Sequence, residues 1–200
     1  MRRTRTLSAA LALLASGCAT AGLSPPAATV EGARGALSYS ASLRVSLKGP
    51  SLRARSRALV AFERPNSLRI EIPGPTGLLL VVVVKDGALA AVFPRDRAVY
   101  RGSAGAADLE ALLGLALAPA EVMDLLVGAP SPRLRAYRAK WGPSLPSRIE
   151  ATLPDGARLD VTIDDAGTGV PLGPAVFAAP SHAGYRAVDA PEARHLWGAR

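Results

Sequence analysis

Few residues of this 200-residue chain have the types and the spacing that catalysis or metal binding requires. The only two histidines, His182 and His195, come late in the chain, and neither lies in a metal-ligand spacing. The acidic pair Asp164-Asp165 is followed by Ala-Gly, an order typical of a loop. The sequence has neither a Gly-x-Ser-x-Gly elbow nor a glycine-rich phosphate loop. We therefore expect a protein that is not an enzyme and that has no cofactor and no metal site.

Cys18 is the one residue whose setting points to a chemical modification, and it is the only cysteine. Before it, Arg2, Arg3 and Arg5 precede an apolar run over 7–15, and this order is typical of an export signal. The run is far shorter than the ~20 residues of a membrane-spanning helix. A lone cysteine cannot form an internal disulfide, so it adds no structural crosslink to an exported protein.

The residues around this cysteine, Leu14-Ala15-Ser16-Gly17-Cys18, resemble the lipobox of bacterial lipoproteins. The resemblance implies that residues 1–17 are a signal peptide and that the Cys18 thiol and the new amine carry acyl chains, which anchor the protein to a membrane. Ala19 stands where retention in the inner membrane usually shows Asp, which implies the periplasmic face of the outer membrane. Residues 18–35 are small, contain proline and have no period, so we expect a lipidated tether.

The composition, 49% hydrophobic and 20% charged, is sufficient for one domain with its own core. Removal of the signal peptide takes away three arginines and lowers the net charge from +8 to +5. A basic surplus suits an anionic membrane surface or solubility, and without interleaved aromatic residues it argues only weakly for nucleic acid. Arg53, Arg55 and Arg57 alternate along one predicted strand. They form either a solvated outer face or a contact for anionic lipid headgroups or an acidic carrier.

The strand pattern is organised around seven consecutive apolar residues over 78–84, whose length and β-branching predict a strand. Because no polar residue alternates with them, we expect this strand to be buried on both faces. A second apolar layer must therefore cover the sheet there, either packed helices or a bound hydrophobic ligand.

Period-two alternation and turn signals predict further antiparallel strands on both sides of this one. Asp86-Gly87 and Asp155-Gly156 are hairpin signals between strands. The strands are expected over 37–48, 52–62, 68–72, 88–93, 97–101, 133–141, 148–153 and 159–163, with one or two edge strands in 170–188.

Helical spacing of leucine and valine predicts two short helices, over 107–115 and 119–127, that interrupt the strands. Gly128 and Pro130 supply the stop signal for the second helix. The leucine stripes need an apolar partner, and the sheet offers the only large one. Residues 189–200 are expected to be a frayed tail with a short helix near its middle, at 191–197.

Several stretches carry a resemblance to a known family. They are 68–77 (Leu-Arg-Ile-Glu-Ile-Pro-Gly-Pro-Thr-Gly) leading into the apolar strand, 108–114 (Asp-Leu-Glu-Ala-Leu-Leu-Gly), 117–130 closing on Gly-Ala-Pro, 171–180 and 184–188. Over residues 36–188 the chain resembles the LolA/LolB family of periplasmic lipoprotein carriers, and within it the member that is itself an outer-membrane lipoprotein. The resemblance implies a mainly β (α+β) fold, in which a strongly curved antiparallel sheet forms an incomplete β-barrel with a short-helix lid over an apolar cavity.

An acyl-chain cavity needs an apolar lining and no reactive group, because burial of each CH₂ gains about 0.8 kcal/mol. The expected cavity wall consists of Leu43, Val45, Val60, Phe62, Ile70, Ile72, Leu80 and Val82. The expected lid consists of Leu109, Leu112, Leu113, Val122, Met123, Leu125 and Leu126. An ordinary packed core has the same pattern, so that interpretation stays open. In the family an exposed leucine before the apolar strand is thought to help membrane delivery, and Thr76 takes its place here.

The resemblance implies an outer-membrane lipoprotein that binds acyl chains of lipoproteins, or phospholipid, and helps to localise lipoproteins to the outer membrane. Its implied partner is a soluble periplasmic carrier similar to LolA. The alternative is a lipid-binding or scaffold lipoprotein of the same fold, which serves envelope assembly without lipoprotein transfer. We expect a monomer that binds no nucleic acid.

Overall fold

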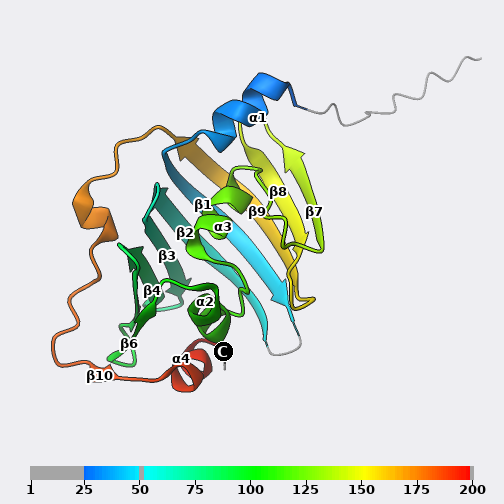
Figure 1. The fold of residues 1–200 in the computed structure, drawn as a ribbon. Coiled ribbons are helices and arrows are strands. Elements are labelled where there is room, and N and C mark those ends of the chain that lie inside the picture. Colours follow the sequence, from blue (N-terminus) through cyan, green and yellow to red (C-terminus); the bar gives the residue numbers. More distant parts are fainter. Residues whose placement is uncertain (1–24, 50–51, 199–200) are drawn as a thin grey trace, which may run out of the picture.

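Ten strands form a single sheet in the computed structural model, which describes residues 25–49 and 52–198 (Figure 1). Cys18, the signal peptide and the first part of the tether lie outside these residues, so their predicted chemistry stays a prediction. None of the helices in the described part of the chain has the length and hydropathy that crossing a bilayer requires.

Six of the strands follow one another both along the chain and across the sheet, each antiparallel to the next. They are β1 (Ser38–Lys48), β2 (Arg53–Glu63), β3 (Ser67–Gly74), β4 (Gly77–Lys85), β5 (Ala88–Phe93) and β6 (Ala98–Ser103). In the hairpin between β4 and β5, Asp86 and Gly87 have φ values of 48° and 80°. This left-handed pair is what a two-residue hairpin turn requires, and it confirms the predicted signal.

Three later strands extend the sheet beyond β1: β7 (Ala136–Trp141), β8 (Pro146–Thr152) and β9 (Arg158–Thr168). At the opposite edge the short β10 (Arg186–Ala187) lies parallel to β6. The strand order is therefore β10-β6-β5-β4-β3-β2-β1-β9-β8-β7. Among the described residues the two edge strands, β7 and β10, do not pair with each other, so the sheet is open and not closed into a barrel.

Four α-helices accompany the sheet: α1 (Ala27–Arg34), α2 (Ala106–Leu113), α3 (Pro119–Leu126) and α4 (Ala190–Gly198). Both predicted inner helices, α2 and α3, are confirmed, and α3 begins with proline in its first turn as expected. Figure 1 shows α2 and α3 lying over one face of the sheet, which we call the inner face. The buried residues of both helices belong to the same core as the inward residues of the strands, so the mainly β fold with a helical layer is confirmed.

The strand β4 is buried on both faces, as its sequence predicts. Its inward residues join the main core, whereas Val81 and Val83 are buried on the other face, outside that core. There the cover is a one-turn helix, η1 (Pro174–Phe177), which contacts β3 and β4 and whose Phe177 is buried. Arg69 of β3 holds this segment by donating to the carbonyl oxygens of residues 176 and 178, at 3.0 and 2.9 Å. We had expected packed helices or a bound ligand as the second layer. On this face the second layer is instead the C-terminal segment that crosses the sheet.

Both segments that flank the sheet domain in the prediction contain a helix, and only the helix in the tail was expected. The predicted tether contains α1, whose Ala33 is buried and whose Arg34 reaches the carbonyl oxygen of Gly128 at 3.0 Å. The predicted frayed tail contains α4, which includes the expected short helix, and its Ala193 is fully buried against the core. Helices this short gain most of their stability from tertiary contacts, which a local pattern does not record.

One prediction about the strands is wrong, and another is confirmed only in part. The pair Asp164-Asp165, expected in a loop, lies within β9, because pairing with β1 continues past a register shift at Ser42 and Leu43. The predicted edge strands in 170–188 reduce to the two residues of β10, and the rest of that segment crosses the outer face.

Gly128, which follows α3, is expected to tolerate no side chain. Its φ of 79° is left-handed, and a Cβ there would lie 2.5 Å from Cζ2 of Trp141. We predict that Gly128→Ala lowers the free energy of unfolding by about 1–3 kcal/mol, measured by urea denaturation. As a matched control, Gly32→Ala in α1 meets nothing within 4 Å and should raise it by up to about 1 kcal/mol. Equal effects of the two substitutions would contradict the argument.

Candidate functional site

An apolar pocket of about 90 Å³ lies between the inner face of the sheet and the helices α2 and α3. Strands β1, β2, β3 and β9 form its wall, and α2, α3, their connecting link and α4 close it. Only two lining residues, Ser56 and Trp197, have a polar side-chain atom. The Ser56 hydroxyl already donates to the carbonyl oxygen of Arg57 at 2.8 Å, so the surface offered to a ligand is almost entirely hydrocarbon.

Five of the eight predicted wall residues line this pocket: Leu43, Val45, Val60, Ile70 and Ile72. The other three, Phe62, Leu80 and Val82, do not, although all are fully buried on the inner face. Phe62 stacks on Tyr39 with ring centroids 5.1 Å apart, which fills the core at that end of β2. Alternation predicts which face a side chain occupies, but not whether other side chains cover it there.

Four predicted lid residues also line the pocket: Leu113, Val122, Leu125 and Leu126. The remaining three, Leu109, Leu112 and Met123, are fully buried core residues that the pocket does not reach. Both helices therefore face the sheet as predicted, and the pocket lies under the C-terminal end of α2 and along α3.

Several lining residues were not predicted: Leu47, Ala54, Ser56, Ala58, Leu115, Leu117, Leu159, Val161 and Trp197. The alternation in β1, β2 and β9 already placed most of them on the correct face. Leu115 and Leu117 lie in the link between α2 and α3, and Trp197 comes from α4. The leucine and valine spacing of the two predicted helices did not include these three residues, so it did not place them at the pocket. The indole Nε1 of Trp197 is buried without a hydrogen-bond partner.

Polar contacts fix both ends of α2. At its first turn Asp108 accepts from the hydroxyl of Ser103 at 2.6 Å and from the hydroxyl of Tyr100. These two bonds hold the pKa of Asp108 below its ordinary value, and the bond to Asp108 raises the pKa of Tyr100 to about 12. At the last turn Arg194 of α4 donates to the carbonyl oxygen of Ala111 at 2.6 Å, where a cation complements the helix dipole.

The C-terminal end of α3 is held by two arginines from other elements. Arg34 of α1 donates to the carbonyl oxygen of Gly128, and Arg64, in the turn after β2, pairs with Asp124 at 2.7 Å. Arg64 also donates to the carbonyl oxygen of Ala36, so it joins α3 to the chain that enters β1. The helix α3 is therefore bound to α1, which precedes β1, and to the turn that follows β2.

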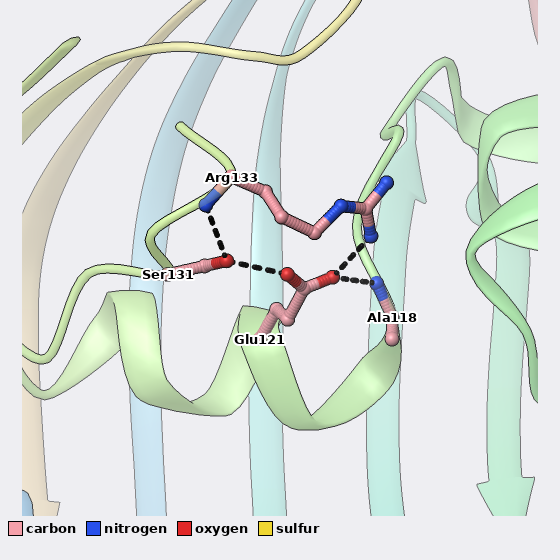
Figure 2. Close-up of polar contacts among 4 residues, drawn as sticks. All are labelled: Ala118, Glu121, Ser131 and Arg133. Carbon is pink, nitrogen blue, oxygen red and sulfur yellow. Dashed lines mark hydrogen bonds and ion pairs between the residues drawn. The ribbon is translucent and has the colours of Figure 1, made fainter. Parts of the chain in front are cut away.

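Glu121 fixes the N-terminal end of α3 (Figure 2). Its carboxylate accepts from the amide of Ala118 at 2.8 Å, from the hydroxyl of Ser131 at 2.5 Å and from the guanidinium of Arg133 at 2.9 Å. Ala118 has no side-chain acceptor, so only this half of a capping box is made. Burial of the Glu121 carboxylate raises its pKa, but the bonds from Ser131, Ala118 and Arg133 together lower that pKa below its ordinary value.

Thr76 lies apart from the pocket. It is exposed in the hairpin between β3 and β4, where the pocket lining does not extend. Leu78, two residues later, is 37% exposed. The predicted delivery loop and the predicted cavity are thus two separate places on the molecule.

The two histidines lie on different segments of the described part of the chain, outside the pocket lining. His182 Nε2 lies 2.7 Å from a guanidinium nitrogen of Arg101, and its Nδ1 lies 2.8 Å from the carbonyl oxygen of Pro180. His195 is exposed on α4. Over residues 25–49 and 52–198, no three His, Cys, Asp or Glu side chains are grouped so that they could hold a metal ion.

Comparisons with known proteins give little for this chain. No family model matches it, and no curated protein matches it. Among solved structures it is similar to the crystal structure of an uncharacterized conserved protein from Thermus thermophilus, with a TM-score of 0.45 and 9% sequence identity. That match covers 80% of this chain and 94% of the other. A likeness at this score carries no argument about function.

The charge of Glu121 should stabilise the cover of the pocket in a pH-dependent way. Because its folded pKa is lowered, its contribution is complete above the unfolded value of about 4.3 and is lost as the pH falls through the folded pKa. We predict that Glu121→Gln lowers the free energy of unfolding at pH 7 by about 0.5–1 kcal/mol. Urea denaturation in acid should then show the wild-type and variant proteins converging. A difference that stays constant with pH would show that the charge of Glu121 is not the cause.

Proposed function

We propose that this chain is a lipid-anchored protein on the periplasmic face of the outer membrane that binds the acyl chains of lipoproteins and helps to localise them there. The observation that carries the proposal is the pocket under α2 and α3, whose lining is hydrocarbon except for Ser56 and Trp197. Such a lining offers nothing to a polar substrate. Each CH₂ that it removes from water stabilises a bound chain by about 0.8 kcal/mol.

The size of the pocket sets a condition on this function. About 90 Å³ is smaller than the roughly 150 Å³ of an apolar cavity that admits one benzene molecule, so the pocket in this arrangement has room for only a short hydrocarbon segment. A whole acyl chain requires α2 and α3 to move from the sheet or from each other. In this proposal the two helices are a lid, and the observed arrangement is its closed state.

The contacts of the two helices favour an opening between them. The polar contacts of α2 go to β6 and α4, whereas those of α3 go to α1, to the turn after β2 and to the loop after α3. Within the described residues no hydrogen bond or ion pair joins α2 to α3. Both helices instead contribute leucines to the shared apolar core, and an acyl chain can replace such apolar contacts because they are not directional.

The resemblance to the LolA/LolB family supplies the rest of the proposal. In that reading a soluble periplasmic carrier hands over the lipoprotein, and the hairpin containing Thr76 meets the membrane. The exposed Leu78 near the hairpin tip offers an apolar side chain where Thr76 does not.

A second candidate function is a lipid-binding or scaffold lipoprotein of the same fold that transfers no lipoprotein. The threonine at position 76 favours it, because the family has an exposed leucine in that loop. Depletion of the protein distinguishes the two. Loss of a receptor should mislocalise many lipoproteins, whereas loss of a scaffold should affect a single assembly pathway.

Filling the pocket should weaken acyl-chain binding without disturbing the opposite face. Ala58 lines the pocket on β2, and Ala61 lies on the other face of the same strand. We predict that Ala58→Leu weakens binding of cis-parinaric acid, a fluorescent fatty acid, by about tenfold, equivalent to about 1.4 kcal/mol of overpacking. Ala61→Leu should bind like the wild type. No uptake by the wild-type protein, or equal loss in both variants, would overturn the proposal.

Lipid anchorage depends on Cys18, which lies outside the described residues. Cys18→Ser should remove the acyl mass detected by mass spectrometry of the N-terminal peptide, because serine offers no thiol for the diacylglycerol. The variant should also leave the outer-membrane fraction. Retention of an unchanged lipid-modified mass would show that the anchor is elsewhere.

A further inference from the structure

A second surface of the molecule is strongly basic and lies opposite to the pocket. It is formed by the outward side chains of five neighbouring strands, β2, β1, β9, β8 and β7, on the face turned away from α2 and α3 (Figure 1). Nine lysines and arginines project from it: Arg44, Lys48, Arg53, Arg55, Arg57, Arg138, Lys140, Arg148 and Arg158. We call these residues the basic face.

The strand register places these cations directly beside one another. Lys48 is opposite Arg53 on one side and opposite Arg158 on the other, so three cations form one row across β2, β1 and β9. Arg44 is likewise opposite Arg57. Neighbouring strands lie about 4.8 Å apart, which is well within the Debye length of about 8 Å at physiological salt. The charges therefore act on one another.

The acidic residues on this face do not neutralise it. Arg44 pairs with Asp164 at 2.6 Å, and Arg148 pairs with Asp160 and Glu150 at 2.6 and 3.2 Å. Among the residues that the structure describes, the other cations have no ion-pair partner: Lys48, Arg53, Arg55, Arg57, Arg138, Lys140 and Arg158. A depression in this face is lined by Lys48, Arg55, Arg138 and Arg158, together with Glu150 and Asp160.

This arrangement brings no benefit to the fold. Like charges placed opposite each other on adjacent strands are destabilising, and neutral residues such as Thr or Ser would serve an exposed strand equally well. A surface of this kind is stabilised when an external anion neutralises several of its charges at once. The shape of the face then decides which anion fits.

We propose that the basic face binds a membrane surface rich in anionic phospholipids. The face is a broad sheet surface with exposed cations on all five strands, which matches an array of phosphate headgroups more closely than a single anion. The outward side chains of these five described strands include no aromatic residue, whereas single-stranded nucleic acid needs stacking platforms. With the basic face on the bilayer, α2 and α3 point away from it, and the lid remains free to open. The proposal does not depend on the function of the pocket.

Vesicle sedimentation tests the proposal, with the full chain carrying Cys18→Ser so that no lipid anchor contributes. The vesicles contain phosphatidylglycerol and phosphatidylcholine in equal parts, or phosphatidylcholine alone. Arg53→Gln combined with Arg55→Gln should lower the partition coefficient on anionic vesicles about 30-fold, because each cation near such a surface contributes about 1 kcal/mol. Raising the ionic strength to about 1 M, where the Debye length is about 3 Å, should remove the difference.

The matched control removes the same charge elsewhere. Lys85→Gln combined with Arg95→Gln acts on exposed residues at the end of β4 and in the β5–β6 turn, away from the basic face. This variant should bind like the parent chain, and so should Arg53→Lys combined with Arg55→Lys, since a headgroup array accepts either cation. Equal loss in both glutamine variants would overturn the proposal, because net charge alone would then account for binding. Binding to neutral vesicles with the same affinity would also overturn it.

A label on the face itself gives an independent readout. In the Cys18→Ser background, Ser46→Cys places a single thiol among the cations, and Ala107→Cys places one on α2. A fluorophore at position 46 should be quenched by quencher-labelled headgroups, and one at position 107 should not. The reverse result would overturn the orientation. Binding of soluble polyglutamate but not of anionic vesicles would overturn the lipid partner and assign the face to an acidic protein.

Discussion

The pairing of β1 with β9 is the interaction on which the rest of this fold depends. It joins the meander from β1 to β6 with the three strands that follow the helices, and β1 also pairs along its whole length with β2. Val45 of β1 therefore lies in the middle of the inner face, between Ser56 of β2 and Val161 of β9, and all three line the pocket. Without this pairing there would be two smaller sheets, neither of which could form the wall.

The second requirement is that α2 and α3 stay over this wall, and the chain meets it with contacts at the helix ends. Asp108 and Glu121 accept hydrogen bonds at the two N-terminal ends, and arginines from α1, α4 and the turn after β2 act at the two C-terminal ends. These signs complement the helix dipoles. The sides of the helices make apolar contacts. The polar contacts at the ends therefore position the helices, while the apolar contacts along their sides can be exchanged for contacts with a bound acyl chain. The pocket and the basic face then occupy opposite faces of one sheet.

The sequence predicted the parts of this arrangement that depend on local periodicity. Alternation is sufficient to assign Leu43, Val60 and Ile70 to the inner face, because a period of two allows no other choice. It could not separate them from Phe62, which faces the same way but is covered by Tyr39. Asp164 was assigned to a loop because its composition is that of a turn.

The remaining differences arise from contacts between distant parts of the chain. Asp164 lies in β9 because backbone pairing with β1, far away in sequence, continues past a register shift, and Arg44 of β1 also forms an ion pair with it. The helices α1 and α4 likewise depend on Arg34 and Ala193 meeting elements that only the folded chain brings close.

The cover of Val81 and Val83 has a consequence for how the chain folds. The run from Leu78 to Val84 is long, β-branched and uncharged, a composition prone to intermolecular β-pairing. Phe177, which shields its outer side, lies far toward the C-terminus, so β4 is made well before its cover. Until the segment containing Phe177 docks on the sheet, the outer side of β4 stays exposed and the newly made chain is prone to aggregation. Docking of this segment therefore protects β4 from intermolecular pairing.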